Sequence, residues 1–218
     1  RILIEDFNED GNQDIFVCAN SAEHNNSSNG LKNKLYFGGK NTFAENFSIF
    51  NSLYNSTGCV VWTDLDSDGD KDLFTGGRLE SFNYGIPPSG YVYENNNNTY
   101  TFSSNLSKAF KYIGMIVDGK SCDLDGDGID ELILLKDMSD IDIFTCKNNV
   151  IKNINTELNL DNIKGYWSSF QIEDLDNDGD LDILVCNKGL NNRFANTSGG
   201  FEMHVNDFDG NGEIEQIS

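Results

Sequence analysis

The sequence predicts an all-β repeat protein made of small four-stranded sheets. One acidic pattern occurs five times in the 218 residues. The runs on either side of it are short, rich in β-branched and aromatic residues, and bounded by turn-forming residues. The first four copies begin at Asp6, Asp64, Asp123 and Asp174, a spacing typical of supersecondary units of about 40 to 60 residues that stack to share a core. We therefore expect one domain over residues 1–218.

The repeated pattern is a nine-residue loop, and its copies are called loops 1 to 5 in chain order. Positions 1, 3 and 5 carry side-chain oxygens, position 6 is glycine, and position 9 is a carboxylate. Oxygen ligands at this spacing can surround one hard cation, while the glycine permits the positive φ that turns the loop around it. The candidate metal ligands are Asp6, Asn8, Asp10, Asn12 and Asp14 (loop 1, 6–14); Asp64, Asp66, Asp68, Asp70 and Asp72 (loop 2, 64–72); Asp123, Asp125, Asp127, Ile129 and Glu131 (loop 3, 123–131); Asp174, Asp176, Asp178, Asp180 and Asp182 (loop 4, 174–182); and Asp207, Asp209, Asn211, Glu213 and Glu215 (loop 5, 207–215).

The ligand chemistry of the loops favours calcium. Position 7 should offer its backbone carbonyl, because Ile129 has no side-chain oxygen. Calcium suits a flexible all-oxygen set better than magnesium, which demands near-ideal octahedral geometry, or zinc, which prefers His and Cys. Loops 1 and 5 carry Asn8 and Asn211 in place of a carboxylate, so we expect them to bind more weakly. The sequence thus predicts up to five calcium ions, one for each loop.

The EF-hand is the nearest alternative for such a loop, and the sequence disagrees with it. An EF-hand needs a bidentate Glu at position 12 and a helix on each side. Flanks such as Cys59–Thr63 are short and β-rich. Each loop is therefore expected to join two strands. The residues at position 12 are Val17, Thr75, Leu134, Val185 and Ser218.

Position 2 of every loop is apolar, so we expect each loop to be pinned to a core by one inward side chain. Two cysteines, Cys18 and Cys186, occupy equivalent places in their repeats and are expected to be small buried hydrophobes. The same pattern makes Trp62 a core residue, because it lies in an apolar run before Asp64. The position-2 residues are Phe7, Leu65, Leu124, Leu175 and Phe208.

Short β-rich runs predict four strands for each of the first units. Only 33 residues separate Asp174 from Asp207, so the fourth sheet should be shortened or irregular. The predicted strands are 2–5, 14–18, 34–37 and 42–47 in the first unit, 59–63, 72–75, 91–94 and 100–103 in the second, and 141–146 and 149–154 at the end of the third, with a long loop over 78–89.

The segments Val61–Phe74 and Lys34–Phe43 resemble FG-GAP/VCBS repeats, and the likeness extends over nearly the whole chain. It implies a β-propeller of about seven four-stranded antiparallel blades, as in the integrin α-subunit, with calcium between the first two strands of a blade. The chain is expected to supply four or five of these blades and to be a piece of a longer protein. In addition, Gly189–Arg193 followed by Val205–Gly212 is similar to bacterial cell-surface repeat proteins of the ASPIC/UnbV-associated type.

Charge and hydropathy argue against nucleic-acid binding and against a membrane-spanning segment. The formal net charge is -21, from 36 acidic and 15 basic side chains, which would repel nucleic-acid phosphates. The longest apolar runs fall short of the roughly 20 residues that cross a bilayer, so no transmembrane segment is expected. Loops of this kind bind calcium at the millimolar levels found outside cells, which predicts an extracellular or bacterial cell-surface location.

The functional prediction is a binding or scaffold module, in which variable loops over 21–30, 78–90 and 188–200 present a partner site on rigid blades. The resemblance implies a protein partner at the cell surface, such as an outer-membrane transport or secretion complex. The alternative is a carbohydrate-binding or polysaccharide-degrading (lyase or hydrolase) propeller, although blade cores also use aromatic residues. Its candidate sugar-stacking residues are Phe82, Tyr84, Tyr91, Tyr166 and Trp167.

Enzymatic activity is not expected. Only His24 and His204 can act as near-neutral general bases. The sequence contains no HExxH, GxSxG or phosphate-loop motif, and its clustered carboxylates are assigned to cations.

Overall fold

The computed structural model describes residues 1–24, 28–46, 55–147, 149–161, 163–189 and 203–217. These residues form strands and two short 3-10 helices, η1 (Asn29–Leu31) and η2 (Leu106–Phe110). No helix in the described part of the chain is long and apolar enough to span a membrane. The strands are β1 (Ile2–Glu5), β2 (Asp14–Val17), β3 (Lys34–Gly38), β4 (Phe43–Asn46), β5 (Ser56–Thr63), β6 (Asp72–Leu79), β7 (Tyr91–Asn95), β8 (Tyr100–Ser103), β9 (Ile116–Cys122), β10 (Glu131–Lys136), β11 (Ser139–Lys147), β12 (Val150–Asn153), β13 (Lys164–Gly165), β14 (Trp167–Glu173), β15 (Asp182–Asn187), β16 (His204–Asn206) and β17 (Glu215–Ile217).

The strands form three four-stranded antiparallel meanders, which we call blade 1 (β1–β4), blade 2 (β5–β8) and blade 3 (β9–β12). In each blade, every strand pairs with the next one along the chain. The short strand β13 pairs with the start of β11, beside its pairing with β12. The predicted four-stranded architecture is therefore confirmed, and the predicted strands agree closely with the observed ones. One difference is that Arg78 and Leu79 extend β6 instead of opening the following loop.

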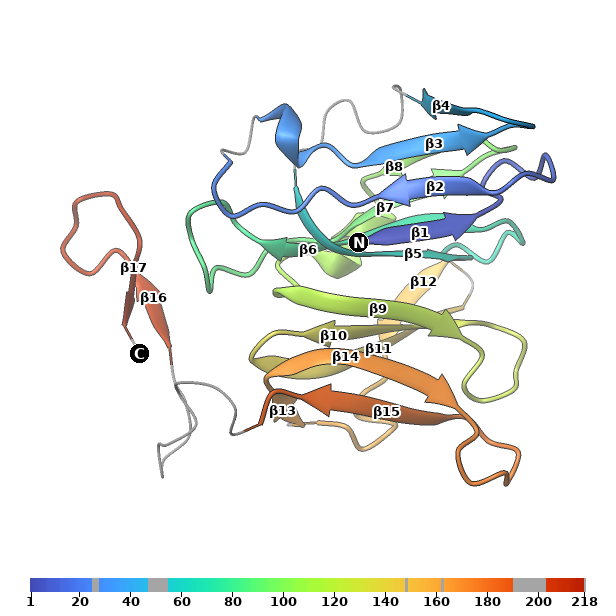
Figure 1. Cartoon of the computed structure of the whole chain (residues 1–218). Coiled ribbons are helices and arrows are strands. Elements are labelled where there is room, and N and C mark those ends of the chain that lie inside the picture. Colours follow the sequence, from blue (N-terminus) through green and yellow to red (C-terminus); the bar gives the residue numbers. More distant parts are fainter. Residues whose placement is uncertain (25–27, 47–54, 148, 162, 190–202, 218) are drawn as a thin grey trace.

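The first strands of successive blades lie side by side, as the inner strands of a propeller do. Figure 1 shows β1, β5, β9 and β14 following one another through the molecule, and β9 packs against both β5 and β14. Gly58 allows the close approach of β5 and β9, because a Cβ atom there would lie 1.9 Å from the Ile116 carbonyl oxygen. Over the described residues the sheets are stacked and do not close into a ring (Figure 1), so the blade number stays a prediction.

Three hydrophobic cores fill the spaces between successive sheets. The period-2 alternation of a strand sends neighbouring side chains to opposite faces. On β5, Val60 joins the core shared with blade 1, while Cys59 and Val61 join the core shared with blade 3. On β10, Leu134 faces blade 2 and Ile133 faces β14. Each middle blade is thus apolar on both faces, which explains its continuous hydrophobic runs.

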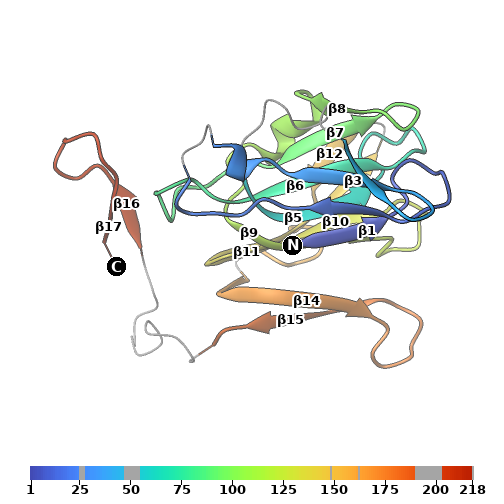
Figure 2. The same ribbon diagram turned by 45° about the horizontal axis from the view of Figure 1, so that its top comes forward.

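The fourth and fifth units differ from the first three. β14 pairs with β15, and β16 pairs with β17, as separate two-stranded sheets. Figure 2 shows β14 and β15 as a layer at the edge of the stack, with the β16–β17 hairpin at the side of the stack. The predicted shortening of the fourth sheet is thus observed over the described residues. Residues 190–202, which contain most of the predicted loop over 188–200, lie outside the described part.

The two equivalent cysteines end in different environments. Cys18 is buried in the core between blades 1 and 2, as expected. Cys186 is exposed, so its predicted burial is wrong. The physical reason is that β15 has β14 as its one strand partner in the described structure, and no further sheet covers its face.

Candidate metal centre

All five acidic loops join the first two strands of their units, as predicted. Loops 1 to 4 lie between β1 and β2, β5 and β6, β9 and β10, and β14 and β15, and loop 5 lies between β16 and β17. Figure 1 shows the first four at the same end of the stacked sheets. Strands flank every loop, so the EF-hand alternative is excluded by the secondary structure.

The glycine at position 6 has the predicted positive φ in every loop, between +86° and +99°. A Cβ atom at these glycines would meet no atom within 4 Å. The requirement is therefore one of backbone conformation and not of space. The glycines are Gly11, Gly69, Gly128, Gly179 and Gly212.

Position 4 is a second left-handed residue that our sequence reasoning missed. Its φ lies between +56° and +74° in all five loops. The signal was present, because glycine and asparagine, which tolerate this conformation, occupy three of the five positions. Two left-handed residues, at positions 4 and 6, bend the chain so that the side chains on either side turn inward. The position-4 residues are Glu9, Ser67, Gly126, Asn177 and Gly210.

Two hydrogen bonds recur in all five loops and hold the first and last carboxylates in place. The position-6 amide donates to the position-1 carboxylate, as from Gly69 to Asp64 at 3.0 Å. The position-2 amide donates to the position-9 carboxylate, as from Leu65 to Asp72 at 2.8 Å. The corresponding donor and acceptor pairs are Gly11 to Asp6, Gly128 to Asp123, Gly179 to Asp174 and Gly212 to Asp207, and Phe7 to Asp14, Leu124 to Glu131, Leu175 to Asp182 and Phe208 to Glu215.

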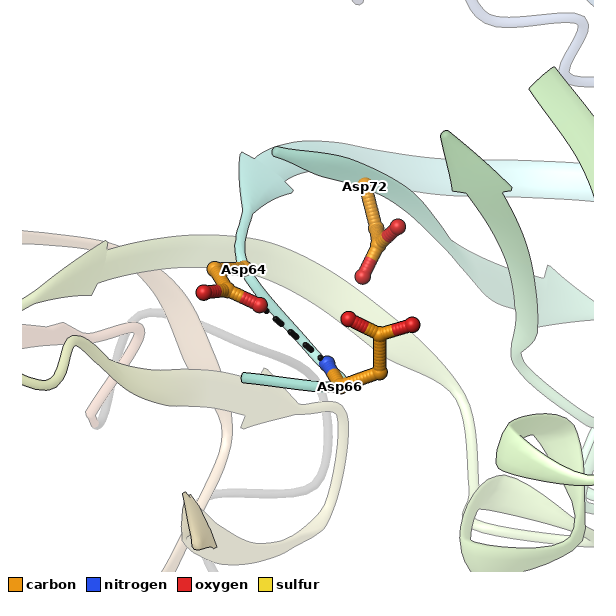
Figure 3. Close-up of side chains that lie close together, drawn as sticks. All are labelled: Asp64, Asp66 and Asp72. Carbon is orange, nitrogen blue, oxygen red and sulfur yellow. Dashed lines mark hydrogen bonds between the residues drawn. The ribbon is translucent and has the colours of Figure 1, made fainter. Parts of the chain in front are cut away.

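Carboxylates converge in four of the five loops. In loop 2, oxygens of Asp64, Asp66 and Asp72 lie within 4.8 Å of one another, and Figure 3 shows Asp66 and Asp72 pointing toward each other beside Asp64. Loops 4 and 5 bring together the same positions 1, 3 and 9, whereas loop 3 brings together positions 1, 3 and 5. These groups are Asp174, Asp176 and Asp182; Asp207, Asp209 and Glu215; and Asp123, Asp125 and Asp127.

The carboxylates of loop 2 have the most strongly raised pKa values among the loops. Burial, followed by the charge of Asp68, raises the pKa of Asp66 to about 6. Burial raises the pKa of the fully buried Asp72 to about 7, even though this carboxylate accepts main-chain hydrogen bonds from Leu65 and Asn95. The Oδ1 atom of Asp70, at position 7, is buried and has no hydrogen-bond partner. A divalent cation would offset the repulsion between these groups and supply the missing partner.

In loop 1, neighbouring asparagines donate hydrogen bonds to the position-5 carboxylate. Asn12 donates from both its backbone and its side chain to Asp10, and these bonds lower the pKa of Asp10. Asn8, at position 3, also donates to Asp10, at 3.2 Å. Among the described His, Cys, Asp and Glu residues, no group of three converges in this loop, which has an amide in place of a carboxylate at position 3. The prediction that loop 1 binds more weakly agrees with this chemistry and remains to be measured.

Loop 3 has a lysine beside its acidic cluster. The Lys147 ammonium, from the end of β11, forms an ion pair with the Asp127 carboxylate at position 5. This contact and the Ile129 amide lower the pKa of Asp127. Sequence reasoning missed Lys147, because nothing in the loop itself indicates a cation arriving from the third strand of the blade. A metal ion in loop 3 would have to compete with this ammonium.

The prediction that all five loops are pinned by an inward side chain is correct for three of them. Phe7 and Leu65 are 0% and 3% exposed, and Leu124 packs against the core between blade 3 and β14. Leu175 and Phe208 are 56% and 48% exposed, so the prediction is wrong for loops 4 and 5. Their two-stranded sheets offer no covering blade in the described part of the chain.

The predicted sugar-stacking aromatics do not form one exposed platform. Trp167 is buried and donates from Nε1 to the Ser139 carbonyl oxygen. Tyr84 donates to Asp137 at 2.9 Å, and Tyr166 and Tyr91 are half-buried. Of the five candidates, Phe82 alone is largely exposed, at 66%. Trp62, which was predicted to be a core residue, packs against the core between blades 1 and 2.

Comparison with known protein families agrees with this geometry. A family model described as FG-GAP-like repeat matches residues 6–75 and 123–185, which together are more than half of the chain. The chain belongs to the FG-GAP-like repeat family. The matched FG-GAP-like regions contain loops 1 to 4, and loop 5 lies beyond them. No curated protein matches the chain.

The FG-GAP-like family accounts for the acidic loops, because its repeats often bind calcium and are typical of extracellular binding modules. The donor set fits a calcium ion, since the converging atoms are all carboxylate oxygens. In loop 2 these residues would be Asp64, Asp66 and Asp72, with Asp70 beside them. The bound ion would supply positive charge that neutralises the cluster.

Proposed function

We propose that this FG-GAP-like chain is a calcium-stabilised extracellular or cell-surface module that binds or scaffolds a protein partner and has no catalytic activity. The observation that carries the proposal is the convergence of Asp64 and Asp66 with the buried Asp72 in loop 2. Like charges this close are costly in the absence of a cation. Binding a cation to the folded loop and not to the unfolded chain stabilises the fold.

The calcium loops fix the junction between the first two strands of each blade. Asp72 is the first residue of β6, and Asp64 follows the last residue of β5. A cation held by both residues would tie the end of one strand to the start of the next. Positions 1 and 9 converge in the same way in loop 4, so the inner strands of units 2 and 4 would be anchored at the same end of the stack (Figure 1).

The partner surface that we propose lies at the opposite end of the sheets, where the strand 2 to strand 3 connections gather. The loops of blades 1 and 2 meet there, because the Phe82 amide donates to the Ala22 carbonyl oxygen at 3.0 Å. The blade 2 loop is also anchored to blade 3, since Arg78 and Tyr84 both bind the buried Asp137. Anchored loops on a rigid scaffold suit recognition. The exposed Phe82 is placed to contact a partner.

The class of partner follows from charge and from the family. A net charge of -21 disfavours nucleic acid and anionic lipid surfaces. The resemblance to bacterial surface repeat proteins supports a cell-surface protein partner, such as a transport or secretion complex of the outer membrane. The two histidines support no active site, since His24 and His204 are exposed and lie in different units.

Removal of calcium tests the proposal. At 1 mM free calcium, a site with a Kd of about 10⁻⁴ M contributes about 1.4 kcal/mol to folding. For a domain of this size, this corresponds to a loss of about 3 to 6 °C in Tm per site in chelator. Differential scanning calorimetry with and without chelator measures it.

Magnesium at the same concentration is the control and should restore little of the loss, because it tolerates this flexible oxygen set poorly. An identical Tm in chelator and in calcium would contradict the proposal.

A further inference from the structure

Loops 1 and 2 are joined by two aromatic side chains of blade 2. The Tyr100 hydroxyl, on β8, donates to the Phe7 carbonyl oxygen at 2.9 Å. The Trp62 indole Nε1, on β5, donates to the Tyr100 hydroxyl oxygen at 3.0 Å and to the Lys71 carbonyl oxygen at 3.1 Å. Phe7 is position 2 of loop 1, and Lys71 is position 8 of loop 2. A continuous chain of hydrogen bonds therefore runs from one loop to the other.

Each end of this chain holds the peptide unit that precedes a candidate ligand. The peptide bond is planar, so fixing a carbonyl oxygen also fixes the amide and Cα of the next residue. The Phe7 carbonyl belongs to the peptide that leads into Asn8, at position 3 of loop 1. The Lys71 carbonyl belongs to the peptide that leads into Asp72, at position 9 of loop 2. Both contacts thus act on the direction in which a ligand side chain points.

The network is well supported by its surroundings. Tyr100 is buried, and the Phe7 and Trp62 rings pack edge to face with centroids 5.5 Å apart. A second contact from the same blade reaches loop 1, where the Asn98 side chain donates to the Asn8 carbonyl oxygen at 2.6 Å. The Tyr100 to Phe7 bond is buried, the Trp62 to Tyr100 bond is partly buried, and the Trp62 to Lys71 bond is exposed. Because hydrogen bonds in a chain polarise one another and the aromatic rings are packed, we expect a displacement at one loop to be passed to the other.

Blade 3 makes an equivalent contact with loop 2. The Leu65 carbonyl oxygen, again at position 2, accepts a hydrogen bond from the Cys146 thiol at 2.9 Å. The Ser67 hydroxyl in turn donates to the Cys146 carbonyl oxygen at 3.2 Å. The same carbonyl is thus held by the following blade in both loop 1 and loop 2.

We propose that Trp62 and Tyr100 are positioning residues that couple cation binding in loop 1 to cation binding in loop 2. This inference rests on the proposed calcium function. A cation in either loop orders the peptide units that the network holds, and this lowers the cost of ordering the other loop. Occupancy of one loop is then expected to raise the affinity of the other about fivefold or more.

The test follows each loop separately by NMR. The Gly11 and Gly69 amides bind the position-1 carboxylates of loops 1 and 2, so their resonances report calcium in each loop. Asp66→Ala weakens loop 2 while leaving Asp64 and its hydrogen bonds in place. We expect it to raise the calcium midpoint of Gly11 about fivefold when Tyr100 is present. In a Tyr100→Phe background, Asp66→Ala should leave the Gly11 midpoint unchanged.

Tyr112→Phe is the matched control, because this tyrosine is 64% exposed and belongs to neither loop contact. In this background Asp66→Ala should shift the Gly11 midpoint as it does in the unmodified chain. If Asp66→Ala shifts the Gly11 midpoint equally in the unmodified chain and in the Tyr100→Phe background, the coupling is overturned. The coupling is also overturned if Asp66→Ala does not change the calcium midpoint of Gly11 in the unmodified chain.

A measurement that leaves loops 1 and 2 unaltered guards against unfolding of the variants. The chain has two tryptophans, so Trp167→Phe leaves Trp62 as the single tryptophan, which can be excited selectively at a wavelength that tyrosine does not absorb. Its emission should change along both the Gly11 and the Gly69 transitions. If the Trp62 emission stays constant while both glycine resonances shift, the inference is contradicted and the conclusion that the loops bind calcium still holds. If neither glycine responds to calcium, the proposed function itself is wrong and the inference falls with it.

Discussion

Loops 2 and 4 carry almost the same sequence and have different surroundings. Both hold three aspartates at positions 1, 3 and 9 within 4.8 Å, and both make the hydrogen bonds from position 6 to position 1 and from position 2 to position 9. In loop 2 the position-2 leucine and the position-9 aspartate are buried between blades, whereas Leu175 and Asp182 in loop 4 are exposed. The conformation of the loop is therefore a local property, and its burial is a property of the neighbouring sheets.

This difference changes what each carboxylate does. Asp72 accepts two main-chain hydrogen bonds, from Leu65 and from Asn95 at the end of β7. Asp14 in loop 1 does the same with Phe7 and Gly38. In blades 1 and 2 the position-9 carboxylate thus connects the loop to the end of the third strand, a role that needs a third strand to be present.

The largest predicted difference comes from removing that carboxylate in the absence of calcium. Asp72→Ala leaves two buried amides without an acceptor, which costs about 1 to 3 kcal/mol for each amide. The expected loss of unfolding free energy is therefore about 2 to 6 kcal/mol. Denaturant unfolding in chelator measures it.

Asp182→Ala is the matched variant in loop 4, and it should cost less than about 1 kcal/mol, because the position is exposed. Equal losses for the two variants would remove the distinction between complete and two-stranded units.

The position-2 leucines should show the next largest difference. Leu65→Ala removes a fully packed side chain from the core between blades 2 and 3 and should cost about 2 to 5 kcal/mol. Leu175→Ala, at the exposed equivalent position, should cost less than about 1 kcal/mol. Thermal and denaturant unfolding of the two variants check this prediction.

A large loss for Leu175→Ala would show that its side chain is covered in solution, and the contrast between loops 2 and 4 would then disappear.

Lys147 provides the smallest predicted effect and distinguishes loop 3 from the others. Lys147→Met removes the ammonium that pairs with Asp127, so calcium should bind loop 3 about two- to tenfold more tightly. Stability without calcium should change little, because the pair is partly exposed and screened by solvent. Calcium titration followed at the Gly128 amide measures the change.

Lys152→Met is the control, since Lys152 pairs with Glu157 and not with a loop. A loop 3 affinity that is the same in both variants would show that Lys147 does not compete with the cation.

The sequence predicted the loops and the strands beside them because both depend on short-range patterns. The spacing of oxygens in loop 2, the glycine at position 6 and the continuous apolar run of β5 are visible within about ten residues. Contacts between blades are invisible at that range. Lys147 reaches Asp127, and Tyr100 reaches Phe7, only after the blades have folded and stacked.

By itself the sequence determined that this chain forms acidic turns between paired β-strands, because ligand spacing and backbone conformation are set by neighbouring residues. The tertiary structure decided which of these turns are buried, which carboxylates lose water, and which loops are joined. Those properties depend on the sheet that lies across each face. Nearly the same motif is therefore part of a packed core in loop 2 and an exposed turn in loop 4.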